Sequence, residues 1–229
     1  MRDEPGAGAI EAVIFDLDGV LIDSEAVWER ARRAFVREHG GTYTERATRD
    51  VMGMSAPEWA HYIRVSLGVA LEEERINREI AGLVAAAYEV RLPLFPGAAA
   101  AVRRMAARLR LGLASSSNRS LIDLVVREAG LAGTFAAIVS SEEVGIGKPA
   151  PDVYLRTAAL LGVVPARCAA VEDSTNGLRS AKRAGMRVIA LPNREYPPAA
   201  DALALADVVL PEIAALDVTT LGYLDSPGP

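Results

Sequence analysis

An alternation of apolar runs with amphipathic stretches fills the second half of this chain and limits what it can fold into. From residue 98 onward the pattern predicts helices at 98–108, 119–129, 151–161 and 175–184. Between and after them it predicts strands at 110–115, 136–140, 168–172, 187–191 and 207–210. Such an alternation is typical of a parallel sheet covered by helices on both faces. The apolar run at 12–15 must join that sheet, because a single strand is not stable alone.

The segment between the first strand and residue 98 has a different pattern. It reads as helix almost throughout, with amphipathic stretches near 24–39, 56–67 and 71–90. Prolines and a glycine at 92–97 then interrupt the chain. We therefore predict an α/β protein with a Rossmann-like parallel-sheet core at 1–21 and 94–229 and an inserted α-helical cap at 22–93. The two ends, residues 1–9 and about 225–229, are expected to be unstructured.

The composition suits a globular enzyme and argues against several other classes. The chain has 229 residues, of which 51% are hydrophobic and 24% charged, enough for a full core and an accessory domain. Its net charge of -5 gives no basic surface, so nucleic acid is not an expected partner. No apolar run is long enough for a membrane span or a signal peptide, so a cytoplasmic protein is expected. Cys168, His39 and His61 cannot form a disulfide framework or a Cys/His metal cluster.

Polar residues gather where the predicted strands end, and open α/β sheets bind ligands at that edge. The first strand runs into Asp16 and Asp18. If the strand alternation continued through residue 18, both carboxylates would leave one face about 6–7 Å apart. Taken alone, the pair is explained equally well by a turn. The second strand is followed by hydroxyl and amide groups that could bind an anion: Ser115, Ser116, Ser117 and Asn118. Helix capping by Ser117 or Asn118 is the competing explanation for one of them.

Two further strand ends complete this edge. The loop after the third strand holds Lys148 between a glycine and a proline, in a chain with 23 arginines and only two lysines. A lysine is therefore a selective choice here, and its compact ammonium suits one phosphoryl oxygen or one carboxylate. The fourth strand ends in Glu172 and Asp173, for which capping of the next helix by Asp173 or Ser174 is the competing explanation.

The charges of these residues predict a cation. Asp16, Asp18, Glu172 and Asp173 would bring four negative charges together, and Lys148 offsets one of them. One divalent cation would change the balance from -3 to -1, and one protonated carboxyl would make it zero. Carboxylate ligands and a phosphorylated substrate favour Mg²⁺. One carboxyl is also expected to have a raised pKa, which would suit it to general acid catalysis.

Four motifs stand in the order and setting known from one family. Residues 15–20 (Phe-Asp-Leu-Asp-Gly-Val), Ser115, residues 147–152 (Gly-Lys-Pro-Ala-Pro-Asp) and residues 171–174 (Val-Glu-Asp-Ser) resemble the motifs of the haloacid dehalogenase superfamily. The chain is similar to its phosphatases with a helical cap, of the β-phosphoglucomutase and phosphoglycolate phosphatase type. The likeness runs from about residue 11 to residue 216.

The resemblance implies roles for these residues. Asp16 would be the nucleophile that takes the phosphoryl group as an aspartyl-phosphate. Asp18 would protonate the leaving oxygen and later deprotonate the attacking water. Ser115 and Lys148 would hold phosphoryl oxygens.

The same resemblance implies a metal site and a substrate site. Mg²⁺ would bind the Asp16 carboxylate, the Asp18 backbone carbonyl and the Asp173 carboxylate, with Glu172 as a further ligand or as a neighbour of the ligands. The loop around Gly53 resembles the specificity loop of the family. Candidate substrate-binding residues are Ser116, Ser117, Asn118 and Glu25.

Departures from relatives narrow the expected activity. Asp18 stands where true dehalogenases lack an acid, and the cap has no lysine for the Schiff base that phosphonatases form. Trp28 and Ala56 align with a histidine and a sugar-phosphate-binding arginine of the β-phosphoglucomutase cap. We therefore expect a Mg²⁺-dependent phosphatase, monomeric or weakly dimeric, acting on a small phosphorylated metabolite of the sugar or polyol phosphate class. A phosphomutase and a non-catalytic phospho-acceptor or binding protein are the alternatives.

Overall fold

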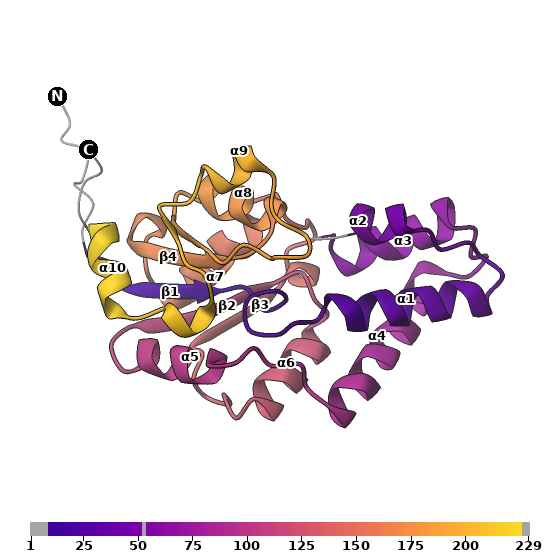
Figure 1. Ribbon diagram of the computed structural model, residues 1–229, viewed down its shortest axis with the longest axis horizontal. Helices are drawn as coiled ribbons and strands as arrows, with labels where there is room; N and C mark the ends of the chain where they lie inside the picture. Colours follow the sequence, from indigo (N-terminus) through magenta and orange to yellow (C-terminus); the bar gives the residue numbers. More distant parts are fainter. Residues whose placement is uncertain (1–8, 52–53, 226–229) are drawn as a thin grey trace.

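The protein forms a six-stranded parallel sheet with helices on both faces and a helical cap inserted after the first strand (Figure 1). The computed structural model describes residues 9–51 and 54–225. The strand order is β3-β2-β1-β4-β5-β6. The strand bounds are β1 Ala12–Phe15, β2 Arg110–Ser115, β3 Ala137–Ser140, β4 Cys168–Glu172, β5 Arg187–Ala190 and β6 Val208–Val209. The predicted α/β core with its inserted helices is confirmed.

The central strands are apolar because both of their faces are covered. All four residues of β1 are fully buried. Val13 and Phe15 point into one hydrophobic core and Ala12 and Ile14 into the other, as the alternation of side chains along a strand requires. The first core contains helices α5 (Ala98–Ala106) and α6 (Arg119–Glu128), and the second contains α7 (Asp152–Leu161) and α8 (Thr175–Arg183).

The remaining elements of the core are short. Helix α9 spans Ala200–Leu203 and α10 spans Val218–Asp225. The described residues also contain 3₁₀ turns that the pattern did not predict, namely η1 Ser141–Glu143, η2 Pro165–Arg167 and η3 Ile213–Ala215.

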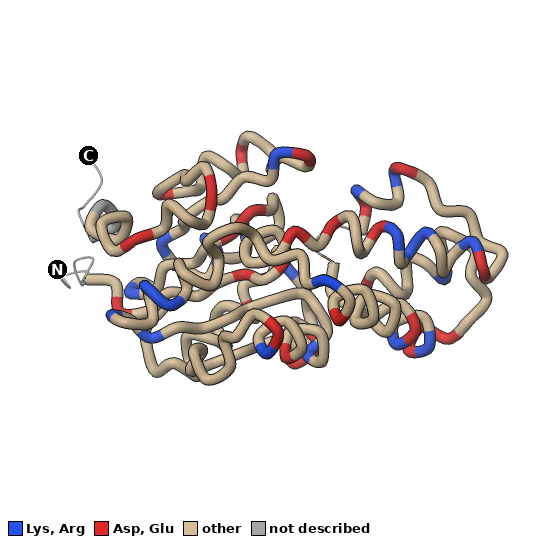
Figure 2. Tube along the Cα trace, turned by 60° about the horizontal axis from the view of Figure 1, so that its bottom comes forward, with Lys and Arg blue, Asp and Glu red and all other residues tan. Residues whose placement is uncertain are grey.

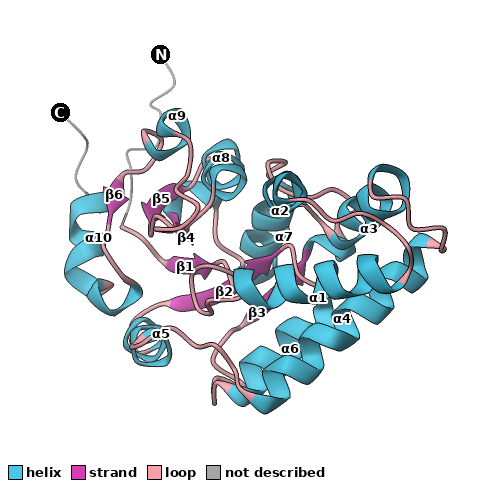
Figure 3. Ribbon diagram, turned by 45° about the vertical axis from the view of Figure 1, so that its right-hand side comes forward, coloured by secondary structure: helices cyan, strands magenta, loops and turns pink. Residues whose placement is uncertain are grey.

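In the described part of the cap, on the right of Figure 1, the chain forms four helices. They are α1 Glu25–Glu38, α2 Glu45–Val51, α3 Ala56–Ser66 and α4 Glu73–Val90. Helix α4 packs against α6 of the core, and Figure 3 shows these two helices side by side. The two chain crossings are hydrogen-bonded to each other, since the Phe95 N–H donates to the Leu21 carbonyl and the Asp23 N–H to the Pro93 carbonyl. The exact cap limits of 22 and 93 stay a prediction.

Some local expectations change. Helix α2 is separate from the three amphipathic stretches seen in the sequence. Strand β1 ends at Phe15, so the strand alternation does not reach Asp18, and the two aspartates do not share one strand face. Helix α10 extends to Asp225, where an unstructured end was expected. The rest of the predicted tails, residues 1–8 and 226–229, lie outside the described residues, as do residues 52–53 of the loop around Gly53.

Charged residues of both signs are mixed along the core and the cap (Figure 2). Among the described residues, the structure has no helix with the length and apolar character needed to cross a membrane.

Candidate active site

A small cavity of about 70 Å³ lies between the carboxyl edge of the sheet and the cap. The core lines it with Asp16, Asp18, Ser116, Ser117, Lys148, Asp173 and Ser174. The cap lines it with Glu25, Trp28, Arg32, Val51, Met54 and Trp59. The site is therefore built by strand ends that are far apart in the sequence and become neighbours in the parallel sheet.

Lys148 is the centre of a buried ion-pair network. Its Nζ donates to Asp16 Oδ1 at 2.8 Å, to Glu172 Oε1 at 2.6 Å and to the Ala114 carbonyl at 3.2 Å. The Tyr154 hydroxyl donates to the same Glu172 oxygen at 2.7 Å. Burial by itself would lower the pKa of Lys148, but the two carboxylates outweigh it and hold that pKa above its ordinary value. The lysine is therefore a fixed cation with its charge directed at Asp16.

Three acidic side chains meet beside this lysine. Asp16, Glu172 and Asp173 are all buried, and one oxygen from each lies within 4.8 Å of the others. Burial raises the pKa of Asp16 to about 8, with Lys148 lowering it and the neighbouring carboxylates raising it. Burial, followed by Glu172 and Asp16, also raises the pKa of Asp173 well above its ordinary value. Raised pKa values therefore belong to two carboxyls of this cluster, Asp16 and Asp173, where the sequence predicted one carboxyl for general acid catalysis.

Two glycines make room for the acidic cluster. Gly19 has a φ of 79°, and a Cβ built there would overlap the Asp173 carboxylate. A Cβ at Gly177 would overlap the Glu172 carboxylate. The backbone therefore approaches these two carboxylates more closely than a residue with a Cβ would allow.

These residues fit a hard divalent cation. The donors are carboxylate oxygens, which Mg²⁺ prefers, and their crowding in a buried site is unfavourable without a positive charge. Glu172 directs Oε1 to Lys148 and Tyr154, and its Oε2 accepts from the Asp173 N–H at 3.2 Å. Asp16, Glu172 and Asp173 could hold such an ion.

Asp18 faces the cap rather than the lysine. Its carboxylate accepts hydrogen bonds from Ser24 Oγ at 2.5 Å, Ser117 Oγ at 2.7 Å and Trp28 Nε1 at 3.3 Å. This separation from Asp16 follows from the end of β1 at Phe15, because the loop then turns Asp18 toward α1. The two aspartates line one cavity with different partners, which suits different chemical roles.

The polar residues after β2 divide into three environments. Ser115 is fully buried, and its Oγ accepts from the Ser117 N–H at 3.0 Å. Ser116 and Ser117 line the cavity. Asn118 lies outside its lining, where its amide donates to Asn77 of α4 at 2.8 Å and to Glu142 at 2.7 Å. Asn118 thus connects the core to the cap, and the predicted phosphoryl contact of Ser115 stays a prediction.

Sequence reasoning missed three residues that the structure brings to the site. Tyr154 and Ser24 carry no distinctive pattern in the sequence. Arg32 does carry a signal, because it interrupts the apolar stripe of α1 four residues after Trp28. Glu25, a predicted substrate-binding residue, is half-buried in the cavity wall, and burial raises its pKa to about 7.

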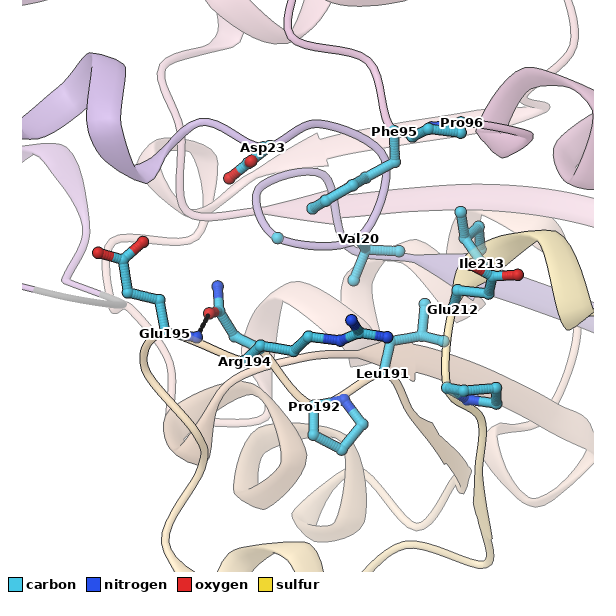
Figure 4. A pocket seen from close by; sticks show the side chains of 13 residues that line it. Val20, Asp23, Phe95, Pro96, Leu191, Pro192, Arg194, Glu195, Glu212 and Ile213 are labelled. Carbon is cyan, nitrogen blue, oxygen red and sulfur yellow. Dashed lines mark hydrogen bonds between the residues drawn. The ribbon is translucent and has the colours of Figure 1, made fainter.

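A second, larger cavity of about 390 Å³ lies along the two chain crossings (Figure 4). Val20, Asp23 and Phe95 line it from the crossings, together with Leu191–Glu195 and Ile213. Gly19 borders both this cavity and Asp173. Asp23, Glu195 and Glu212 also line this second cavity, whereas Asp16, Lys148 and Asp173 line the first.

The sequence of this chain is similar to one protein family and to several known proteins. The haloacid dehalogenase-like hydrolase family matches residues 10–185. The chain belongs to this family. Hexitol phosphatase B of Escherichia coli K12 is 37% identical to this hydrolase over 93% of the chain and 96% of its own length. The phosphorylated carbohydrates phosphatase of Thermotoga maritima is 32% identical over 79% of the chain and 84% of its own length.

A solved structure agrees with these matches. The crystal structure of CbbY from Rhodobacter sphaeroides in complex with phosphate superposes with a TM-score of 0.83 at 29% identity, covering 93% of this chain and 99% of that one. The sequence-based assignment to a haloacid dehalogenase-like phosphatase with a helical cap is confirmed.

Proposed function

We propose that this hydrolase is a Mg²⁺-dependent phosphatase that cleaves a small sugar or polyol phosphate through a phosphorylated Asp16. The observation that carries the proposal is the buried contact of Lys148 with Asp16 and Glu172 at the carboxyl edge of the sheet. It places one acidic side chain beside a fixed positive charge at the wall of a cavity. The substrate class is supported by relatives named as a hexitol phosphatase and a phosphorylated carbohydrates phosphatase.

In the first step, one carboxylate oxygen of Asp16 attacks phosphorus while the bond to the leaving oxygen breaks. Oδ1 of Asp16 is held by Lys148, so the other oxygen is available for the attack. Asp18 donates its proton to the leaving oxygen, and the alcohol departs toward the cap. Lys148 stabilises the negative charge that spreads over the phosphoryl oxygens.

In the second step, Asp18 takes a proton from water, and the water oxygen attacks the phosphorus on Asp16. The bond between phosphorus and the Asp16 oxygen breaks, which releases inorganic phosphate and restores the free carboxylate. Ser24, Ser117 and Trp28 hold the Asp18 carboxylate in place for both proton transfers. A single residue can serve both steps because the first leaves it ionised.

The acidic cluster would hold Mg²⁺ through Asp16, Asp173 and the Asp18 backbone carbonyl, with Glu172 in the same cluster. When bound, the ion would supply positive charge that offsets repulsion between the carboxylates and the phosphoryl oxygens. Hydrolysis is favoured over a mutase reaction by Trp28, which lies where the mutase cap has its histidine. Its indole N–H donates to Asp18, and an indole cannot relay a proton as an imidazole can.

The proposal is tested by a screen of about a hundred phosphomonoesters, with Mg²⁺ and with EDTA. Asp16→Asn should lower kcat at least about 10³-fold for every substrate, because the amide is a poor nucleophile. Asp123→Asn, which changes an exposed acid on α6, is the matched control and should keep wild-type rates. Retained turnover in Asp16→Asn would disprove the nucleophile. Phosphorylated protein that accumulates without turnover would support the phospho-acceptor alternative instead.

A further inference from the structure

An arginine interrupts the buried stripe of the first cap helix. The other buried side chains of α1 are Val27, Trp28, Ala31, Phe35 and Val36, at helical spacing. Arg32 lies among them and is only 7% exposed. Burial lowers its pKa from the ordinary arginine value. A buried guanidinium is costly unless its donors find partners, so a partner is expected here.

Two aromatic rings contact the guanidinium group of Arg32, but not all of its N–H donors have a hydrogen-bond partner. Its Cζ lies 4.7 Å from the centroid of the Trp28 ring and 5.5 Å from that of Trp59. Such contacts use the flat faces of a guanidinium and leave its in-plane N–H groups as hydrogen-bond donors, one of which has the Tyr43 side chain as its partner. In the part of the chain that the structure describes, the buried Nε has no hydrogen-bond partner. Arg32 also lines the cavity that contains Asp16 and Asp18.

The neighbouring charges indicate what kind of group would bind. Glu25 lies two helical turns before Arg32 on α1 and lines the same cavity. The opposite charges of Arg32 and an ionised Glu25 cancel. A second anionic group on the substrate would therefore gain little here. Hydroxyl groups fit better, since each can accept from Arg32 and donate to Glu25.

We propose that Arg32 and Glu25, with the Trp28 indole as an apolar wall, form a subsite for the hydroxyl-bearing carbon chain of the substrate. The proposal rests on the proposed phosphatase function and names the residues that select its leaving group. The phosphoryl group lies at Asp16 and Lys148, and the carbon chain extends toward α1. Carbon–hydrogen groups of the chain pack on the indole, while the hydroxyls exchange hydrogen bonds with the two charged side chains.

The two tryptophans of the chain provide a direct readout. Trp28 and Trp59 are the only tryptophans in the sequence, and both contact Arg32. Intrinsic fluorescence of the inactive Asp16→Asn protein with Mg²⁺ can therefore be titrated with sorbitol 6-phosphate, glucose 6-phosphate, phosphoglycolate and inorganic phosphate. At least one of the two hydroxylated compounds should bind at least about tenfold more tightly than phosphoglycolate and phosphate. Equal or tighter binding of phosphoglycolate would overturn the proposal.

Variants of Arg32 separate recognition from structure. In the Asp16→Asn background, Arg32→Met should reduce the preference for the hydroxylated compound over phosphate at least about tenfold. Arg33→Met, at the neighbouring and more exposed arginine, should leave this preference unchanged. Should Arg32→Met fail to fold by circular dichroism, Arg32→Lys decides, because it keeps the charge but removes the planar donors. Equal weakening of all compounds would assign Arg32 a structural role and overturn the proposal.

Kinetics keep the two proposals apart. In the enzyme with Asp16 intact, kcat/KM is measured for the hydroxylated substrate and for p-nitrophenyl phosphate. Arg32→Met should lower the first value relative to the second at least about tenfold. Wild-type turnover with an unchanged ratio would overturn the subsite and leave the phosphatase function standing. Absence of all turnover, combined with Arg32-dependent binding in fluorescence, would overturn the phosphatase function and support the subsite.

Discussion

Replacing Lys148 by methionine tests the buried network at the centre of the site. The change removes the positive charge between Asp16 and Glu172, whose oxygens lie 2.8 and 2.6 Å from Nζ. The lysine side chain is 3% exposed and the Glu172 side chain is fully buried, so water cannot replace the lost partner. Leaving buried charges uncompensated costs about 3–5 kcal/mol of the free energy of unfolding.

The pH dependence of this loss follows from Asp16. Its pKa in the folded protein is about 8 against an ordinary value of 3.8, so the stability of the fold falls as pH rises from about 3.8 to 8 and this group changes it no further above 8. Lys148 lowers that pKa, and its removal raises it further. The variant should therefore hold the Asp16 proton at pH 9, where the wild type has lost it. The loss of stability should be larger at pH 9 than at pH 6.

The assay is urea denaturation in EDTA at both pH values, which excludes any contribution from bound metal. The matched control is Lys182→Met, at the second lysine of the chain. Lys182 is 40% exposed and lies 3.3 Å from Asp207, so its loss should cost at most about 1 kcal/mol. If the two variants lose equal stability, or if the loss at Lys148 shrinks with rising pH, the reasoning fails.

Two further variants test the surroundings of the network, each by urea denaturation. Tyr154→Phe removes the hydroxyl that donates to buried Glu172 and should lower the free energy of unfolding by about 1.5–3 kcal/mol. The control Tyr62→Phe, at a less buried tyrosine, should lower it less. Equal losses in the two variants would contradict this prediction. Glu25→Gln removes an acid whose pKa rises from 4.5 to about 7 on folding. Wild-type stability should therefore fall between pH 4.5 and 7, making the variant about 1–3 kcal/mol more stable at pH 8 and not at pH 4; a gain at both pH values would refute this.

The sequence indicated the fold because its signals are local and repeated. Buried strands such as β1 read as short apolar runs, and helices such as α6 show an apolar face at helical spacing. The topology rule for parallel sheets then placed the residues after β1, β2, β3 and β4 at one edge. Lys148 could be singled out because a lysine is rare in a chain that otherwise uses arginine.

The partners of each side chain could not be read in the same way. Asp18 faces Ser24 and Trp28 because β1 ends three residues before it, and the sequence gives no sign of that boundary. Tyr154 reaches Glu172 because α7 packs on the sheet beside β2 and β3, which depends on the whole core. Asn118 meets the cap helix α4 instead of the cavity for the same kind of reason.

The sequence by itself determined the alternation of the longer strands and helices of the core, the presence of a helical insertion after the first strand and the types of residue at the strand ends. These follow from periodicity, from turn residues and from the chemistry of carboxylate, hydroxyl and ammonium groups. Only the tertiary structure decided that Lys148 joins Asp16 to Glu172, that Asp18 faces the cap and that Arg32 stacks on two indoles in the cavity wall. Those contacts depend on the directions of side chains and on the distances between segments that are far apart in the chain. Both are fixed only when the core and the cap pack.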